Sequence, residues 1–182
     1  MSDYSCLSIL KNRAKKLARI KNIQLAEALE IVARDAKFTT YHELNAVAKC
    51  DPFEQRLVHA TMGEVTLEEV IYRDDVFYAI DREVENQLSS DLAETNAYGF
   101  TIENLEATKV NYDSKRGIMS VQAIFDYQGE QDPERAFSGS SFDIVAEMEL
   151  LLRDNEWSLV EDSLKLTSVN SNVDNDWYDL EM

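Results

Sequence analysis

The chain has 182 residues, of which 45% are hydrophobic, and its formal net charge is -17. This length suits one domain, or one domain with an appendage, and the apolar fraction is sufficient for a buried core. With five glycines and two prolines, the composition excludes a collagen-like array and argues against long disordered linkers.

The sequence shows no export signal and no apolar run long enough to span a membrane. Its two cysteines, Cys6 and Cys50, are far apart, and reduced thiols are the default state in such a chain. We therefore expect a cytoplasmic protein that has no membrane partner.

Charge divides the chain into parts of opposite sign. Residues 1–50 contain nine Lys or Arg against five Asp or Glu, a net charge of +4. Residues 51–182 contain nine against thirty, a net charge of -21. Such asymmetry indicates two surfaces with different partners. We expect a basic helical module over 1–50, an acidic α+β domain over 51–167 and an acidic aromatic tail over 168–182.

Apolar spacing predicts three helices in the basic module. In the first helix an apolar residue recurs every three or four positions, which forms one buried stripe. These residues are Leu7, Leu10, Ala14 and Leu17. A second helix is expected from about Ile23 to Ala36. A third follows Thr40, which is placed to form a capping box with Glu43.

The solvent side of the first helix is basic. Six cations could contact nucleic-acid phosphates or a protein partner, or could simply form a solvated face. They are Lys11, Arg13, Lys15, Lys16, Arg19 and Lys21. The third helix offers few side chains that suit base edges, so sequence-specific reading of DNA is not expected.

Residues 10–48 carry a distinct pattern, which runs ALE, two hydrophobic residues, Ala-Arg, then a small residue, a Phe and an aromatic–His pair. Its positions here are Ala28, Leu29, Glu30, Ala33, Arg34, Phe38, Tyr41 and His42. The pattern resembles a small helical module at the start of assorted proteins from bacterial plasmids and phages. Lys37 stands where that module usually has a glycine. This resemblance implies a mobile-element origin and no particular activity, because the module accompanies unrelated partners.

The acidic domain is expected to begin with helices over 64–95. Thr66 and Glu69 form a second capping box that opens a short helix. A longer helix is expected from about Asp75 to Thr95, with an apolar residue on nearly every turn of one face. These residues are Val76, Ile80, Val84, Leu88 and Leu92.

Alternation of apolar and polar residues predicts antiparallel strands in the second half of the chain. The strands are expected at 101–112, 118–127, 142–152 and 157–167, which together form a meander over 101–167. Turns are expected at 112–117 and 153–156. The apolar residues of the first strand change face between Ala107 and Val110, so we expect a bulge in this strand.

The expected fold class is therefore α+β. An N-terminal three-helix module precedes a long helix that packs on a four-stranded antiparallel meander sheet. The element order over 75–167 resembles cystatin-like and nuclear-transport-factor-like folds. That resemblance implies a curved sheet around a helix, in many such proteins with a pocket or a dimer face, and no particular chemistry.

Three acidic residues on one strand form a candidate partner face. Asp143, Glu147 and Glu149 alternate with apolar residues, and same-face residues on a strand lie about 6.8 Å apart. They could therefore imitate successive phosphates, so an acidic DNA mimic that inhibits a DNA-binding protein is the alternative function. Acidic surfaces also commonly serve solubility alone.

The tail places large apolar side chains among acids. These are Trp177, Tyr178 and Leu180. They could pack on this chain, or they could dock into a basic, hydrophobic groove of a second copy or another protein.

No catalytic, metal or cofactor signature stands out in the sequence. Asp113 and Lys115 have the spacing found in some nucleases, but they fall in an expected turn. Cys50, His42 and His59 lack the paired spacing of zinc ligands. We therefore expect a non-enzymatic interaction protein of a bacterial mobile element, without a cofactor. It would bind a protein partner and could contact nucleic acid through residues 1–50, and a homodimer is left open.

Overall fold

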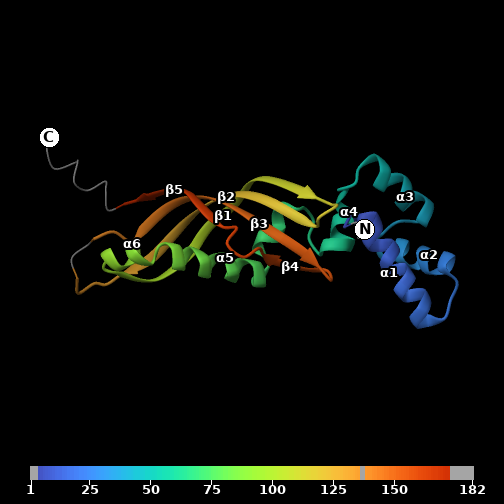
Figure 1. The fold of residues 1–182 in the computed structure, drawn as a ribbon, viewed down its shortest axis with the longest axis horizontal. Coiled ribbons are helices and arrows are strands. Elements are labelled where there is room, and N and C mark those ends of the chain that lie inside the picture. The colour runs from blue at the N-terminus through green and yellow to red at the C-terminus, as the bar shows by residue number, and fades with distance from the viewer. Residues whose placement is uncertain (1–3, 136–137, 173–182) are drawn as a thin grey trace. The chain divides into compact units, whose positions relative to one another are not determined.

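The computed structural model describes residues 4–135 and 138–172 (Figure 1). The helices come first in the chain and an antiparallel sheet follows them. The fold class is therefore α+β, as the sequence predicts. No helix in the described part of the chain is long and apolar enough to cross a membrane.

The three helices predicted for the basic module form as α1 (Cys6–Lys21), α2 (Leu25–Asp35) and α3 (Tyr41–Cys50). The capping box at the start of α3 is present in a shifted form. The Thr40 hydroxyl accepts from the Glu43 N–H at 3.2 Å, and the Glu43 carboxylate accepts from the Thr39 N–H at 2.8 Å.

Lys37 connects α2 to α3 in a backbone conformation that suits glycine. Its φ of 65° lies in the left-handed region, where a side chain costs about 1–2 kcal/mol. This geometry gives a physical reason for a glycine at that place in the resembling module.

A fourth helix, α4 (Gln55–Met62), is not predicted by the sequence analysis. It is short, and its N-cap is a glutamate instead of a serine or threonine. The Glu54 carboxylate accepts from the backbone N–H groups of Arg56 and Leu57. The buried residues of α4 are Leu57, Val58, Thr61 and Met62.

The long helix predicted over 75–95 is divided into α5 (Asp74–Gln87) and α6 (Ser89–Glu94). The break falls at Leu88, and the two serines that follow favour caps and turns over helix interiors. Val76, Ile80, Val84 and Leu88 of the predicted stripe are buried, and Leu92 is half-buried. The short helix predicted after Thr66 is a 3-10 helix, Glu68–Tyr72.

The sheet contains five strands: β1 (Ala97–Asp113), β2 (Ile118–Gln131), β3 (Ser141–Arg153), β4 (Glu156–Leu159) and β5 (Lys165–Ser171). Their order is β1-β2-β3-β4, and β5 pairs with β3 in the antiparallel sense. The single strand predicted over 157–167 is therefore two strands, and β5 extends into the first residues of the predicted tail.

The predicted alternation is confirmed in β2 and β3, where every second side chain is buried. These residues are Met119, Val121, Ala123, Phe125 and Tyr127 in β2, and Phe142, Ile144, Ala146, Met148, Leu150 and Leu152 in β3. The helix α5 lies along the sheet (Figure 1), and it belongs to the same compact unit as most of β1, β2 and β3. The turn between β3 and β4 forms where it is predicted, with Asp154 and Asn155 both at positive φ, 51° and 69°.

From Phe100 onward, the strand β1 changes face twice. Its less exposed residues there are Phe100 and Ile102, then Leu105 and Ala107, then Val110 and Tyr112. One extra residue at each change reverses the faces, as in a bulge, and the second change is the predicted one. Asn104 marks the first change with a φ of 52°, and its amide donates to Asp126 at 2.6 Å.

The described elements form two compact units. The first unit holds the residues up to Val70 together with Tyr112–Ile118 and Leu152–Trp157, and the second holds the other segments. The first unit is thus larger than the module predicted over 1–50. It includes α4 and two hairpin turns that the sequence analysis assigned to the acidic domain.

Aromatic packing explains why the hairpin turns belong to the first unit. Trp157 is 2% exposed, and its ring centroid lies 5.8 Å from that of Tyr112. Phe53 packs edge-on against Tyr112 at 6.0 Å, and the Tyr112 hydroxyl donates to the Tyr4 carbonyl at 3.0 Å. Half of the buried residues of α1 to α3 are alanines, so the rings of Tyr112 and Trp157 add large apolar groups to a core that these helices fill with small ones.

The second unit contains a half-buried carboxylate, Asp81 on α5, and its environment predicts how stability depends on pH. Burial raises the pKa of Asp81, the backbone N–H of Ile102 partly offsets that rise, and Glu85 adds to it. One carboxylate oxygen of Asp81 has no hydrogen-bond partner among the described residues. The pKa of Asp81 is therefore higher in the folded protein than in the unfolded chain, where it is about 4. The contribution of Asp81 to stability is fully present below about pH 4 and is lost as the pH rises through the folded-state pKa.

The substitution Asp81→Asn should therefore stabilise the protein at about pH 7 and flatten the fall in stability above about pH 4. Urea unfolding at several pH values measures this effect. Asp91→Asn, at an exposed position on α6, removes the same charge and should change stability little. An Asp81→Asn protein no more stable than the Asp91→Asn protein at neutral pH would contradict the prediction.

Candidate partner-binding surfaces

The outer side of α1 carries most of the predicted cations in exposed positions. Lys15, Lys16, Arg19 and Lys21 are exposed, and Lys11 is half-buried. Among the described residues, no ion pair joins any of these five side chains to an acidic group. We call the surface formed by these five side chains the α1 basic face.

Arg13 differs from the other five cations. Its guanidinium donates to the backbone carbonyls of Ala60 and Thr61, with 3.0 Å to the latter, and to the Asn155 side-chain oxygen at 3.2 Å. These carbonyls lie near the end of α4, where cations stabilise a helix. Burial lowers the pKa of Arg13. Arg13 therefore links α1, α4 and the β3–β4 turn, and the sequence analysis was wrong to place it in the solvent-facing set.

An exposed apolar side chain that the sequence analysis did not single out lies at the C-terminal end of α1. Ile20, between Arg19 and Lys21, is 82% exposed. Leu25, the first residue of α2, is 46% exposed. The exposed aliphatic side chains thus follow each other at the corner between α1 and α2. The only sequence signal for Ile20 was that it falls outside the apolar stripe.

A cleft of about 300 Å³ lies beside this face in the first unit. The lining side chains that matter here are Ile9, Asn12, Arg13 and Lys16 of α1, and Arg153, Asp154 and Asn155 of the β3–β4 turn. Three of the lining residues are cations and one is an acid. The cleft therefore favours an anionic group.

Arg153 is the cleft residue that sequence reasoning missed. Its guanidinium lies over the Tyr4 ring, 4.6 Å from the centroid, and its Nη1 donates to the carbonyls of Arg116 and Leu152 at 3.1 and 2.6 Å. Strand parity was the available signal, because Arg153 directly follows the buried Leu152 and must face the other side. Its contact with Tyr4 joins residues that are far apart in the sequence, and no local pattern indicates such a contact.

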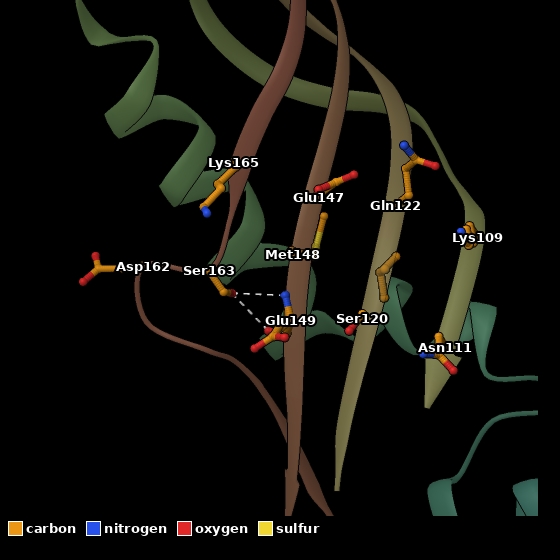
Figure 2. Close-up of a pocket in the computed structure, with 11 residues that line it drawn as sticks. Lys109, Asn111, Ser120, Gln122, Glu147, Met148, Glu149, Asp162, Ser163 and Lys165 are labelled. Atoms are coloured by element: carbon orange, nitrogen blue, oxygen red, sulfur yellow. Dashed lines mark hydrogen bonds between the residues drawn. The ribbon is translucent and has the colours of Figure 1, made fainter. Parts of the chain in front are cut away.

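The predicted acidic partner face lies in the second unit and is mixed in charge. A groove of about 650 Å³ is lined by Glu147 and Glu149, but also by Lys109 and Lys165 (Figure 2). In the pairing of β3 with β5, Lys165 stands directly opposite Glu147. Lys165 beside Glu147 interrupts the row of negative charge that imitation of a phosphate backbone requires, and Lys109 adds a second cation to the groove from β1.

The two glutamates and Asp143 are not equivalent in the structure. Glu147 and Asp143 are exposed, whereas Glu149 is half-buried, and Asp143 stands opposite Asn170 outside the groove. The Ser163 hydroxyl bonds both the N–H and the carbonyl of Glu149, at 3.1 and 3.2 Å (Figure 2). The loop between β4 and β5 is thereby attached to β3, at the place where the predicted fourth strand is interrupted.

Charge is distributed differently between the compact units than between the predicted parts of the chain. The residues of the first unit include 13 Lys or Arg and 13 Asp or Glu, whereas those of the second include 5 and 22. The first unit is therefore neutral, and the whole net charge of -17 belongs to the second. The α1 basic face is a local surface of a neutral unit.

Two groups of residues from the sequence analysis remain, the large apolar residues of the tail and the possible metal ligands. Trp177, Tyr178 and Leu180 lie outside the described residues. Within residues 4–135 and 138–172, no group of three or more His, Cys, Asp or Glu side chains could hold a metal ion.

Gly117 provides the space in which Tyr4 and Arg153 stack. A Cβ atom at this position would lie 2.8 Å from Tyr4 Cγ and 2.9 Å from Arg153 Nη1, and the φ of Gly117 is 66°. Gly99 is a matched control, because its φ is 64° and nothing lies within 4 Å of its Cβ position. The two glycines share the backbone conformation and differ in crowding.

We expect Gly99→Ala to cost about 1–2 kcal/mol, the price of a left-handed alanine. Gly117→Ala should cost about 1–3 kcal/mol more, because the stacked pair must move. Urea unfolding of both variants measures the difference. Equal losses would show that the space beside Gly117 does not hold the stack in place.

Comparisons with known proteins identify no relative for this chain. No protein-family model matches it, and no curated protein matches it in sequence. Its function is therefore inferred from the surfaces described above.

Proposed function

We propose that this protein is a non-enzymatic interaction protein whose α1 basic face binds an acidic, partly apolar segment of a protein partner. The observation that carries the proposal is Ile20, which is 82% exposed on a helix with four exposed cations, none of them in an ion pair among the described residues. The association with a bacterial mobile element rests on the sequence resemblance of residues 10–48.

The apolar centre of the face favours a protein over a nucleic acid. Phosphates are contacted by cationic side chains and by polar hydrogen-bond donors, so the aliphatic Ile20 and Leu25 would contribute nothing to that contact. Protein interfaces combine an apolar centre with a charged or polar rim. A partner segment with both carboxylates and aliphatic side chains would match the charge of the cations and cover the two exposed side chains.

The exposed cations determine which partner this face binds more than how tightly it binds that partner. An exposed ion pair contributes about 0–1 kcal/mol, so several are needed for a measurable effect. Burial of an isoleucine adds about 1.5–3 kcal/mol. The face is therefore suited to a transient complex. Complementary charge would give the complex its specificity, and burial of Ile20 would give it most of its affinity.

A DNA-mimic function is not favoured by the sheet. Lys109 and Lys165 share the groove with Glu147 and Glu149, and Lys165 directly faces Glu147 across the strands. We therefore place the partner surface on α1 and not on β3.

Site-specific photo-crosslinking tests the proposal. A benzoylphenylalanine at position 20 should capture a protein from a lysate of the source organism, because Ile20 would be at the centre of the interface. The same probe at Tyr78, which is 67% exposed on α5, controls for non-specific capture. Nuclease treatment should leave the adduct unchanged.

Replacing Lys15, Lys16 and Arg19 by Gln should reduce the yield of this adduct about tenfold or more, since each exposed contact contributes up to about 1 kcal/mol. The matched control replaces Lys49, Lys109 and Lys115, which are exposed and lie outside α1, and should change the yield little. An adduct that disappears with nuclease, or one no stronger at position 20 than at 78, would contradict the proposal.

A further inference from the structure

We propose that the cleft between α1 and the β3–β4 turn is a carboxylate pocket, in which Arg153 holds an acidic side chain of the partner segment. This inference rests on the proposed function and specifies the chemistry of the contact. It adds an anchor outside the basic helix, from a turn far away in the sequence.

The guanidinium of Arg153 is held so that one edge remains open. Its Nη1 donates to two backbone carbonyls, and its face covers the Tyr4 ring. Among the described residues, no acceptor is bonded to its Nε or Nη2. Those two nitrogens form the side-on edge of a guanidinium, which binds a carboxylate through two parallel hydrogen bonds.

The neighbouring backbone holds Arg153 and Tyr4 in their stacked positions. Gly117 leaves the room that the stack occupies, because a Cβ there would meet both Tyr4 and Arg153 within 3 Å. Tyr4 is itself fixed at both backbone groups, since its N–H donates to Ser114 at 2.7 Å and its carbonyl accepts from Tyr112 at 3.0 Å. An arginine that is ordered before binding loses less conformational freedom when a ligand arrives.

The other walls of the cleft suit an acidic peptide. Lys16 adds a second cation and Ile9 adds an apolar wall, and both lie on α1. Asp154 is the one acid that lines the cleft, and no ion pair joins it to Arg153 or Lys16 among the described residues. The described lining therefore keeps two more cations than acids, and neither Arg153 nor Lys16 is in an ion pair with Asp154.

The inference can be tested without knowing the partner. The Nε–H signals of the arginines are followed by NMR in the full chain while a blocked peptide of sequence DLELD is added. The Arg153 signal should shift and saturate, because its Nε–H would join a carboxylate. The Arg116 signal should hardly move, since only its backbone carbonyl takes part in the site. The peptide NLQLN, which lacks the carboxylates, should shift neither signal.

Three variants separate the open edge of Arg153 from its charge. Arg153→Lys keeps the charge but loses the two parallel bonds, and it should weaken DLELD binding about tenfold. Arg116→Lys makes the same change in the neighbouring turn and should change binding less than about twofold. Tyr4→Leu removes the ring under the guanidinium and should weaken binding while Arg153 is retained. Thermal unfolding of each variant confirms that it is folded.

The possible outcomes are distinct. Equal shifts at Arg116 and Arg153, or a peptide affinity unchanged by Arg153→Lys, would overturn the pocket. Inorganic phosphate that saturates the Arg153 signal where DLELD does not would overturn it in favour of a phosphate ligand. A pocket confirmed by the peptide, with no adduct at position 20 in lysate, would mean that the proposed function fails while the pocket stands. An adduct at position 20 without a DLELD response would mean the reverse.

Discussion

The alternation of buried and outward side chains along β3 is the constraint on which the rest of this structure depends. Six side chains from Phe142 to Leu152 are buried, each two residues from the next. A slip of one residue would bury Glu147 and expose the core, so the register is strongly specified. The same parity turns Arg153 outward directly after the last buried residue.

The first unit depends on side chains that the sheet-forming part of the chain provides. Its helices α1 to α3 bury mostly small residues, and a module of this size has difficulty burying enough apolar surface. Tyr112 near the end of β1 and Trp157 in β4, with Phe53, supply large rings in this unit. Arg13, which lines the cleft, joins α1 to the β3–β4 turn through Asn155.

The sequence predicts the parts of the fold that repeat locally. Three helices of the basic module, the alternating strands and their turns, and the change of face near Ala107 in β1 all follow from spacing and turn chemistry. The sequence does not predict α4, because an eight-residue helix with a glutamate cap gives a weak signal. It does not predict the break at Leu88 either, because the apolar spacing continues through it.

The candidate site is less predictable than the fold because it is built from distant contacts. Arg13 has the same spacing as the exposed cations of α1, and only the carbonyls of Ala60 and Thr61 explain why it turns inward. The stack of Tyr4 on Arg153 joins residues from the two ends of the first unit in sequence. The acidic row on β3 was predicted correctly as an outward face, but sequence alone could not show that β1 and β5 place lysines beside it.

Amide hydrogen exchange tests most directly whether the hairpin turns and α1 form one cooperative unit. Trp157→Ala removes the largest buried ring of the turns, which typically costs about 3–5 kcal/mol. The account predicts that protection of the α1 amides of Leu10 and Ala14 falls further than protection of the α5 amides of Ile80 and Val84. If the α1 amides keep their protection while the α5 amides lose theirs, the hairpin turns do not stabilise α1. The turns and α1 would then not form one cooperative unit.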